Sequence, residues 1–549
     1  MIPDHAGSSE SWPNRDVLTR RAATTPDRLA LVDVETDRRW SYRDLDRAVE
    51  ELASDLPGGP GDRVAILSDT RPAFVAMVFA AMRVERTLVP CNLRETPAEI
   101  ASKLARAGVS RAYYTPETAP LVDPVLDALE DSDTDHGTSR SVGADGALPT
   151  HRLSDAKSVG RLEAISADDS SGPASNVTAS GANAPFERDS GDDGVTDLLI
   201  VFTSGTTGEP KGVRLTAANL LTSATASAFR LGVDPADRWL CCLPMYHVGG
   251  LAPVIRSTLY GTTTVIQRAF DPERTAAVLA EHDVTGVSLV PTMCKRLLEA
   301  GWHPPDALRF VLLGGAPASS ALLERCRERG VPAYPTYGMT EAASQIATAT
   351  PAETAIHEGT VGQPLLCTRV TLLDPAGEPV DAGEVGEIVV DGPTITPGYL
   401  EAEIHEADGG PRTQAFGEDG LRTGDLGRRD SDGRLWVVGR VDDRIVTGGE
   451  NVDPVTVAET LETHPSVTAA AVVGLPDPEW GQRVAALVAS QGDLEPAPLN
   501  AHCRDRLAGF ECPKTIGVVE SLPRTHSGTI DREAVVDALE AVGVDLTGS

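Results

Sequence analysis

One stretch of the sequence organises the rest: Thr203-Ser204-Gly205-Thr206-Thr207-Gly208-Glu209-Pro210-Lys211-Gly212. It directly follows the apolar run Leu-Leu-Ile-Val-Phe at 198–202, which is typical of a buried strand. Glycines let backbone N–H groups converge on an anion, and the hydroxyl and ammonium groups add donors. The pattern therefore predicts a loop that binds the phosphates of a nucleotide, with a flexible polar connector as the alternative.

The lysine of this loop distinguishes it from the ordinary P-loop. A P-loop places Gly-Lys-Ser/Thr at the start of a helix. Here Lys211 and Gly212 lead into Val-Arg-Leu at 213–215, which predicts a second strand. We therefore expect a β-hairpin whose connection holds phosphate.

Length and apolar content predict a globular protein of two or more domains. The chain has 549 residues, too many for one compact core, and is 41% hydrophobic. Its longest apolar run, 73–82, is far shorter than a membrane-spanning helix. The first residues show no export pattern, so we expect a cytoplasmic protein without a membrane span.

The charge balance is strongly acidic. The 81 Asp and Glu residues outnumber 48 Lys and Arg residues, of which five are lysine, and the formal net charge is −33. Such a surface repels nucleic acid, so we expect no nucleic-acid partner. Acidity with scarce lysine predicts a halophilic protein, because salt screens the self-repulsion. The 8 cysteines show no C-x-x-C spacing, which argues against structural zinc and disulfides.

Strand and helix patterns alternate on both sides of the loop, which predicts the α/β class with helices on the faces of parallel sheets. Before the loop, we expect strands at 64–67, 87–90 and 112–114, and helices at 72–83 and from 97, the latter with a capping box at Thr96. After it, we expect strands at 238–243, 263–267, 284–290 and 309–313, and helices at 249–260, 271–282, 291–300 and 319–329. A large N-terminal domain with two doubly wound α/β subdomains follows from this pattern.

The remaining segments complete the expected architecture. Short strands separated by Gly and Pro from 359 to 436 predict a small β-barrel, and the residues from 440 predict a small, mobile α+β domain. We place the domains at 1–439 and 440–549. From about 116 to 195 the pattern is lost, and 131–194 has too few apolar residues to offset its ordering entropy. A disordered acidic insertion is expected there, either a solvated loop or a regulatory tail.

The loop resembles the phosphate loop of the adenylate-forming superfamily, which includes acyl-CoA synthetases, luciferases and the adenylation domains of peptide synthetases. Three further stretches resemble that family's motifs in the family's order: Tyr-Gly-Met-Thr-Glu at 337–341, Gly-Leu-Arg-Thr-Gly-Asp at 420–425 and Gly-Arg-Val-Asp-Asp-Arg-Ile at 439–445. The resemblance covers about residues 14–535. It implies that ATP, with Mg²⁺, converts a carboxylic acid into an acyl-adenylate, from which coenzyme A displaces AMP.

The resemblance also implies roles for individual residues. The set expected to cradle the phosphates is Thr203, Ser204, Gly205, Thr206, Thr207, Gly208 and Lys211. The other expected roles are stacking on adenine by Tyr337, an α-phosphate contact by Thr340, magnesium binding by Glu341, acceptance of the ribose hydroxyls by Asp425, support of the sugar by Arg440, and hinge motion at Asp442.

Three more groups complete the predicted site. His247 matches the family's gate beside the acyl pocket, with a buried packing histidine as the alternative. Gly315 and Ala316 follow a predicted strand after Gly314, and the glycines permit close backbone approach to a flat ligand. The residues that resemble the coenzyme A grip are Trp480, Phe510 and Lys514.

Two positions depart from the family pattern. The family usually has a C-terminal lysine that bridges acyl and phosphate oxygens, and Thr529 stands in its place. Either Arg524, Arg532 or another cation substitutes, or adenylation is slow, or the chain is not a ligase. Cys512 occupies a position where coenzyme A ligases often carry arginine.

Within the family, the stretches 243–261, 291–298 and 337–348 most resemble the o-succinylbenzoate:CoA ligases of menaquinone synthesis. Few charged residues lie in these stretches, so none is assigned to the substrate's second carboxylate. The alternatives are a ligase for another aryl or medium-chain acid and a degenerate nucleotide-binding protein. The sequence leaves the oligomeric state open, a homo-oligomer included.

Overall fold

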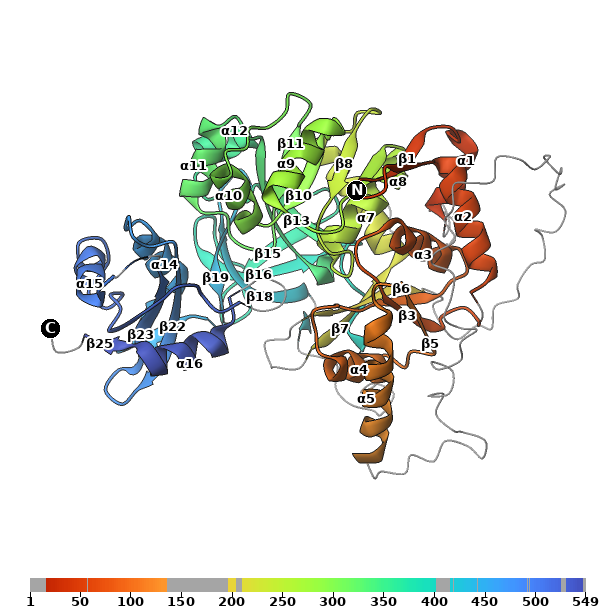
Figure 1. The fold of residues 1–549 in the computed structure, drawn as a ribbon. Coiled ribbons are helices and arrows are strands. Elements are labelled where there is room, and N and C mark those ends of the chain that lie inside the picture. The colour runs from red at the N-terminus through yellow and green to blue at the C-terminus, as the bar shows by residue number, and fades with distance from the viewer. Residues whose placement is uncertain are drawn as a thin grey trace, which may run out of the picture.

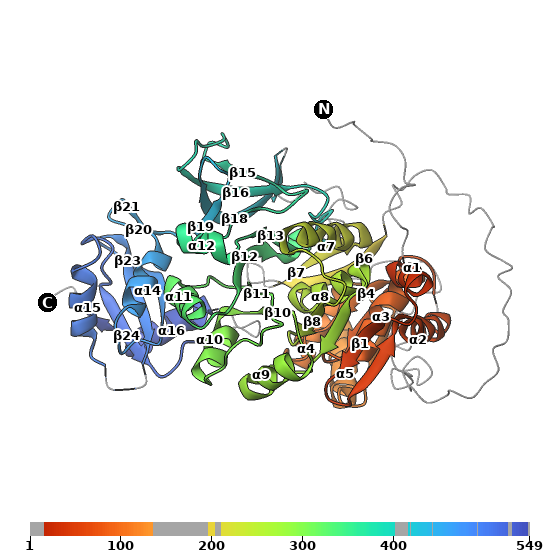
Figure 2. The ribbon, with the colours of Figure 1, turned by 90° about the horizontal axis from the view of Figure 1, so that it is seen from above.

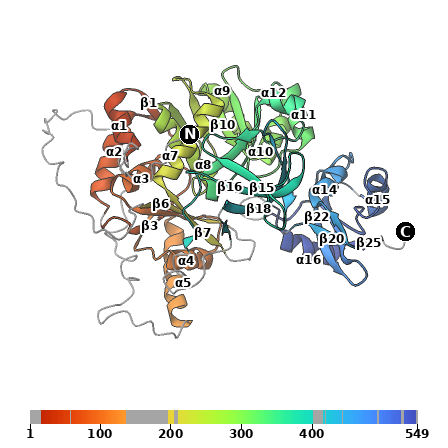
Figure 3. The same ribbon diagram turned by 180° about the vertical axis from the view of Figure 1, so that it is seen from behind.

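The structure, a computed structural model, describes residues 16–56, 58–135, 196–203, 210–400, 415–417, 419–441, 443–490, 492, 494–524 and 530–546. Figures 1 and 3 show it from opposite sides, with the first helices at one end and the last helices at the other. Four sheets and the helices packed on them make up the fold.

The first sheet has five strands in the order β5-β3-β4-β6-β7. β3 (Arg63–Leu67) pairs in parallel with β4 (Thr87–Pro90) and β5 (Arg111–Tyr114), as the alternating pattern predicts. β6 (Asp197–Thr203) runs parallel to β4, and β7 (Lys211–Thr216) returns antiparallel to β6. The predicted hairpin therefore forms one edge of a mostly parallel sheet.

Two helices of this region follow the sequence prediction closely. α3 (Pro72–Arg83) is buried from Pro72 to Met82, so its long apolar run belongs to the protein core. α4 (Pro97–Arg106) begins with the predicted capping box, in which Thr96 and Glu99 accept hydrogen bonds from each other's backbone N–H groups. No helix in the described part of the chain combines the length and apolar character needed to cross a membrane.

α5 (Val122–Asp135) corrects the predicted start of the insertion, because residues 131–135 continue this helix. Val125 and Leu129 are buried in one cluster with Ile100 and Leu104 of α4. The apolar positions are few and are separated by acidic residues, so composition alone favoured a loop. Residues 136–195, which hold the rest of the predicted insertion, lie outside the described residues.

The second sheet has nine strands in the order β14-β13-β12-β11-β10-β8-β9-β1-β2. Its strands are β1 (Leu29–Asp33), β2 (Arg38–Ser41), β8 (Arg238–Cys241), β9 (Thr263–Ile266), β10 (Gly286–Leu289), β11 (Phe310–Leu313), β12 (Ala333–Met339), β13 (Ser344–Thr348) and β14 (Gln363–Pro364). β1 pairs in parallel with β9, although the two strands are far apart in sequence. The first described strand therefore lies in this second sheet, a placement that chain order does not suggest.

The helices between and around these strands are α1 (Val17–Thr24), α2 (Tyr42–Ser54), α7 (Ala217–Leu231), α8 (Val248–Tyr260), α9 (Pro272–Glu281), α10 (Pro291–Glu299), α11 (Ser320–Glu328) and α12 (Pro351–Ile356). The predicted boundaries of α8 to α11 agree with these bounds to within about one residue at each end.

The region from 359 to 436, for which the sequence predicts a small β-barrel, contributes most of a five-stranded antiparallel sheet. The sheet contains β15 (Arg369–Leu373), β16 (Val385–Asp391), β17 (Phe416–Gly417), β18 (Gly420–Arg429) and β19 (Leu435–Arg440). β18 lies between β16 and β17 and also pairs with β19. Figure 2 shows this sheet beside α12 and β13.

The last sheet belongs to what we call the C-terminal unit, in contrast to the large unit formed by everything before it. Its strands are β20 (Ile445–Thr447), β21 (Glu450–Val452), β22 (Ala469–Asp477), β23 (Gly481–Ala489), β24 (Thr515–Val519) and β25 (Val544–Asp545), with helices α14 (Pro454–Glu462), α15 (Pro496–Arg504) and α16 (Arg532–Val542). β19 ends at Arg440 and β20 begins in the new sheet at Ile445.

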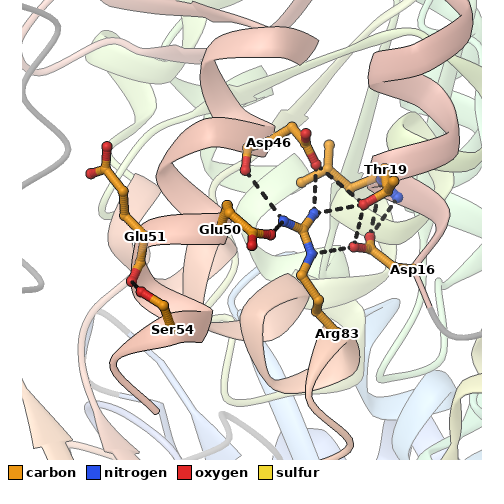
Figure 4. Close-up of polar contacts among 8 residues, drawn as sticks. Asp16, Thr19, Asp46, Glu50, Glu51, Ser54 and Arg83 are labelled. Carbon is orange, nitrogen blue, oxygen red and sulfur yellow. Dashed lines mark hydrogen bonds and ion pairs between the residues drawn. The ribbon is translucent and has the colours of Figure 1, made fainter. Parts of the chain in front are cut away.

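An ionic cluster joins the first three helices at the far end of the large unit (Figure 4). The Arg83 guanidinium of α3 is ion-paired with Asp16, at the N-terminus of α1, and with Asp46 of α2. It also meets Glu50 of α2 at 2.7 Å. One largely buried arginine thus links three helices through ion pairs with three carboxylates.

Candidate active site

The hairpin of β6 and β7 keeps its register up to the last residues that are described on each side. Thr203 lies opposite Lys211. Arg106 of α4 donates from Nη2 to the carbonyl oxygen of Pro210 at 2.8 Å, so α4 fixes the backbone immediately before Lys211. The Lys211 ammonium lies 5.5 Å from the centroid of the Tyr399 ring. The other predicted phosphate ligands, Ser204, Gly205, Thr206, Thr207 and Gly208, lie outside the described residues.

Three predicted residues from distant parts of the chain meet at one carboxylate. Asp425, on β18, accepts a hydrogen bond from the Tyr337 hydroxyl at 2.6 Å through Oδ2. Its Oδ1 accepts one from Nη1 of Arg440, on β19, at 2.9 Å. Each carboxylate oxygen has a second lone-pair direction, so both can still accept a bond from a ribose hydroxyl. The predicted grouping of Tyr337, Asp425 and Arg440 is therefore found in the fold.

The protonation of this group follows from its burial. Burial raises the pKa of Asp425, while the Tyr337 hydroxyl and the charge of Arg440 oppose that rise. Burial and the nearby Asp425 charge raise the pKa of Tyr337 well above its ordinary value, which keeps its hydroxyl protonated as a donor. Asp425 is thus the acceptor at the centre of the group.

Glu341 connects this group to the phosphate hairpin. It lies buried in a short 3₁₀ turn, Thr340–Ala342, between β12 and β13. Its Oε1 accepts a hydrogen bond from the Tyr399 hydroxyl at 3.0 Å. Burial raises the pKa of Glu341, and the charges of Lys211 and Arg440 both oppose that rise. Lys211 and Glu341 both contact Tyr399, so the hairpin and the turn that carries Glu341 lie side by side.

A glycine makes the turn around Glu341 sterically feasible. A Cβ placed on Gly338 would lie 1.8 Å from the carbonyl oxygen of Ser344. No other residue fits at this approach of β12 to β13 without shifting the backbone. Ala343 takes the left-handed conformation at φ 54°, and the chain then turns into β13.

The predicted adenine loop lies at the neighbouring strand end. Gly314, Gly315 and Ala316 follow β11, which is the parallel neighbour of β12, the strand that carries Tyr337. Gly315 has φ 78°, a left-handed conformation that favours glycine. Ligands of open α/β sheets bind at the carboxyl ends of the strands, and this loop occupies that edge.

His247 lies at the N-terminus of α8, with its ring 4.7 Å from that of Tyr246. Burial lowers its pKa to about 4, and the charges of Arg94 and Lys103 act in the same direction. The imidazole is therefore neutral at pH 7. Both the gate and the packing role need a neutral ring, so the role of His247 stays a prediction.

Arg256, on α8, was not assigned a role from the sequence. Its side chain is wholly buried, and burial lowers its pKa to about 10. Its Nη2 lies 3.3 Å from the hydroxyl of Ser344, and its guanidinium lies 5.2 Å from the Trp239 ring centroid. Among the described residues its Nε has no hydrogen-bond partner, and no carboxylate contributes to the shift of its pKa. The sequence signal that could have identified Arg256 is that it is the single charged residue of α8.

The predicted coenzyme A residues lie in the C-terminal unit. The Lys514 ammonium sits 3.9 Å from the ring centroid of Trp480, and Gly448 donates to the Trp480 carbonyl oxygen at 2.8 Å. Trp480 and Phe510 are each 39% exposed, which is high for large aromatic side chains. Cys512 is buried, and burial raises its pKa. Within the described chain, no contact joins Trp480 or Lys514 to the group around Asp425.

Two predicted positions near the junction of the units cannot be placed, because Asp442 and Thr529 lie outside the described residues. Of the cations considered as substitutes at Thr529, Arg532 meets Asp443 at 2.6 Å. Arg524 forms a bridge with Ile530 through its backbone. The charge of Asp443 also raises the pKa of Asp425, so Arg532 and Asp443 lie close to the ribose group.

The donor set fits magnesium held together with a nucleotide. In the described parts of the chain no group of three or more His, Cys, Asp or Glu residues could hold a metal by itself. Mg²⁺ commonly takes one or two carboxylates and completes its shell with phosphate oxygens and water. Glu341, buried beside Lys211, offers one such carboxylate.

Family models match both parts of the chain. The model for AMP-binding enzymes matches residues 18–400, and the model for the C-terminal domain of AMP-binding enzymes matches residues 456–529. The chain belongs to the family of AMP-binding enzymes, and the resemblance inferred from the sequence is confirmed.

Several proteins similar to this chain are named for the same acid. A 2-succinylbenzoate–CoA ligase of Geobacillus kaustophilus is 35% identical over 92% of this chain and 94% of its own length. The structure of o-succinylbenzoate CoA synthetase from Bacillus subtilis with its acyl-adenylate intermediate has a TM-score of 0.80, at 30% identity, covering 96% of this chain and 98% of that chain. A double mutant of that synthetase with its product analogue has a TM-score of 0.64 at the same identity and coverage. These likenesses confirm the predicted fold class.

Proposed function

We propose that this chain is an AMP-forming ligase that activates o-succinylbenzoate with ATP and transfers the acyl group to coenzyme A, a step of menaquinone biosynthesis. The observation that carries the proposal is the meeting of Tyr337, Asp425 and Arg440 beside Glu341 and Lys211. These residues offer an acceptor for ribose, a carboxylate for a metal and a cation for phosphate within one site. The similarity to 2-succinylbenzoate–CoA ligases supports the choice of acid.

In the first half-reaction an oxygen of the acid bonds to the α-phosphorus of ATP, and the bond from that phosphorus to pyrophosphate breaks. Asp425 and Arg440 hold the ribose, Thr340 contacts the α-phosphate, and the adenine lies between Tyr337 and the Gly315–Ala316 loop. Lys211 places positive charge where the phosphates gain negative charge. Glu341 holds Mg²⁺, which neutralises phosphate charge when it is bound.

In the second half-reaction the sulfur of coenzyme A bonds to the acyl carbon, and AMP leaves with the electron pair of the broken C–O bond. The thiol proton passes to solvent. Trp480, Phe510 and Lys514 hold the coenzyme, and the C-terminal unit turns about Asp442 to bring it to the acyl-adenylate. The domain boundary at residue 440 is part of this proposal.

Arg256 gives a physical reason to prefer a dicarboxylic acid. A buried cation without a carboxylate partner costs free energy, and a bound anion removes that cost. Arg256 donates a hydrogen bond to Ser344, which is three residues after Glu341 in the chain. We assign to it the carboxylate of o-succinylbenzoate that is not activated. A medium-chain monocarboxylic acid would leave this guanidinium unpaired.

The experiment that tests the function is acid-dependent release of pyrophosphate and AMP, with and without coenzyme A, in high salt. The panel holds o-succinylbenzoate, its analogue without the ring carboxylate, benzoate and a medium-chain acid. The proposal predicts turnover with o-succinylbenzoate well above the rest. Equal turnover with the medium-chain acid would favour the alternative ligase, and ATP binding without AMP formation from any acid would favour the non-enzyme.

Thr529 needs a separate experiment, because several substitutes for the family's lysine stay open. The Thr529→Lys variant adds the missing cation. A gain of about 100-fold in adenylation rate, the size expected for one transition-state donor, means that no other residue fills the role. An unchanged rate means that a cation such as Arg532 already does so.

We also propose that the protein works in a salt-rich cytoplasm. The formal charge of −33 and the five lysines among 48 basic residues support this setting. Dilution from molar salt to about 0.1 M lengthens the Debye length from about 3 to about 10 Å, so repulsion between carboxylates grows. Unfolding on dilution, followed by circular dichroism, is the expected result, and a salt-independent melting temperature would contradict it.

A further inference from the structure

The contact between α10 and the C-terminal unit involves one lysine. The Lys295 ammonium, on α10 of the large unit, donates a hydrogen bond to the carbonyl oxygen of Thr468 at 3.1 Å. Thr468 lies in the short connection between α14 and β22. Figures 1 and 2 show α14 beside the end of the large unit that carries α10 and α11. The contact therefore joins two parts of the chain that lie on opposite sides of the proposed hinge.

Carboxylates surround this contact. Burial raises the pKa of Glu462, at the end of α14, and the charges of Lys295 and Arg524 oppose the rise. Burial also raises the pKa of Glu459, and the charges of Glu462, Asp453 and Glu358 act in the same direction. Glu358 belongs to the large unit and the other carboxylates to the C-terminal unit. Like charges thus face each other across the junction.

Lys295 compensates part of that repulsion from the large unit. Its ammonium is a compact point charge with three donors, so it can serve the Thr468 carbonyl and the field of Glu462 together. Turning the C-terminal unit about residue 442 would separate α10 from Thr468 and lose both interactions. The contact therefore stabilises one arrangement of the two units and not the other.

The arrangement in this structure is closer to one of the two solved arrangements. The TM-score is 0.80 with the acyl-adenylate complex and 0.64 with the product-analogue complex, at equal coverage and identity. The two solved structures belong to the same synthetase, so the lower score indicates a different placement of parts within one fold. The contact of Lys295 with Thr468 belongs to the arrangement that scores higher.

We propose that Lys295 is a positioning residue that holds the C-terminal unit in the arrangement used for the first half-reaction. It touches neither substrate. The proposal rests on the proposed function, because it assigns the two arrangements to the two half-reactions. Lys295 favours formation of the acyl-adenylate and must release Thr468 before coenzyme A can react.

The test compares two variants on the same helix. Lys295→Gln removes the ammonium, and Arg296→Gln is the matched control. Arg296 is the next residue, and its guanidinium lies 5.4 Å from the Phe270 ring centroid, within the large unit. Both variants lose one positive charge of α10. Lys295→Arg, which keeps a donor and a charge, is the rescue variant.

Three measurements separate positioning from general damage. The first is o-succinylbenzoate-dependent exchange of pyrophosphate into ATP, and the second is transfer from isolated acyl-adenylate to coenzyme A in a single turnover. We expect Lys295→Gln to slow the pyrophosphate exchange by about threefold to tenfold, the population shift expected from the loss of one ordinary, solvent-exposed hydrogen bond. Transfer should be unchanged or faster. Arg296→Gln should change neither rate, and Lys295→Arg should restore most of the exchange.

The third measurement does not depend on activity. Backbone hydrogen exchange of residues 463–470 should be faster in Lys295→Gln than in Arg296→Gln, because the C-terminal unit leaves α10 more often. Equal hydrogen exchange in the two variants would overturn the proposal, and so would an equal loss in both half-reactions. If the wild-type protein forms no adenylate from any acid, the proposed function fails. Faster backbone hydrogen exchange in Lys295→Gln, but not in Arg296→Gln, would still establish the positioning contact.

Discussion

The proposed AMP site and the proposed coenzyme A surface are built in opposite ways. Around Asp425, Tyr337 of β12 and Arg440 of β19 already donate hydrogen bonds to the carboxylate of β18 before any ligand arrives, and the Asp425 side chain is only 13% exposed. On the C-terminal unit, Trp480 and Phe510 are 39% exposed, and Lys514 rests on the Trp480 ring. An acyl-adenylate is a reactive anhydride that water destroys, so its site must be fixed and dry. In the proposed function the acceptor binds from solvent to a unit that turns, and an open surface suits that task.

The largest effect is expected from removal of Asp425, the acceptor at the centre of the proposed AMP site. Asp425→Asn removes the charged acceptor that Arg440, Tyr337 and the proposed ribose hydroxyls share, and each hydrogen bond to a charged group is worth about 1.5–3 kcal/mol. We expect kcat/KM for ATP to fall by about 30-fold to more than 1000-fold. Steady-state adenylation kinetics measure it. Transfer from isolated acyl-adenylate should fall less, and an ATP dependence like that of the wild type would show that Asp425 does not hold the ribose.

The next largest effect concerns the acid rather than the nucleotide. In Arg256→Met the proposed partner of the second carboxylate is lost, and a hydrogen bond to a charged group is worth about 1.5–3 kcal/mol. The preference for o-succinylbenzoate over its analogue without the ring carboxylate should fall by about 10- to 100-fold, measured as the ratio of kcat/KM values.

Two features make that experiment specific. Arg256→Lys keeps a cation and should retain part of the preference. The KM for ATP should stay near its wild-type value in both variants. An unchanged preference in Arg256→Met would remove Arg256 from the acid site.

A third prediction concerns stability in the buried region around His247. Its pKa in the folded state is about 4, below the ordinary value of 6.5. Between these values the unfolded chain binds more protons than the folded one, so stability falls as pH falls through that window. Between pH 7 and pH 5 the free energy of unfolding should fall by about 1–2 kcal/mol less in His247→Gln than in the wild type.

Urea unfolding at the two pH values measures the difference. His303→Gln, at an exposed position, is the control and should behave as the wild type does. A pH dependence in His247→Gln equal to that of the wild type would show that His247 is not held neutral by burial.

The smallest expected effect lies on the open side of the comparison. Trp480→Ala removes the ring on which Lys514 rests, and an exposed cation–π contact is worth about 0.5–1 kcal/mol. We expect the KM for coenzyme A to rise by about twofold to fivefold, with adenylation unchanged. Phe229→Ala, at an aromatic residue on α7 that is 74% exposed, is the matched control. If Trp480→Ala slowed adenylation as much as it weakened the use of coenzyme A, the division between the two surfaces would be contradicted.

Local patterns predicted the elements of this fold better than their assembly. The capping box at Thr96, the buried helix at 72–83 and the hairpin at Lys211 depend on neighbouring residues, so the sequence was sufficient for them. α5 was missed because its few apolar residues gain their meaning only from packing on α4. Arg256 was missed because its burial without a carboxylate partner among the described residues is a property of its surroundings rather than of its helix.

The sequence by itself determined which residue types were available: glycines and hydroxyls after a strand, an acidic surface, and a tyrosine, two carboxylates and an arginine in the order of the family's motifs. The tertiary structure decided that β1 joins β9, that Tyr337 and Arg440 share Asp425, and that Arg256 lies buried near Ser344. The reason is that strand and helix formation depends on contacts within a few residues. Burial, charge compensation and hydrogen bonding between distant segments exist only once the sheets have packed.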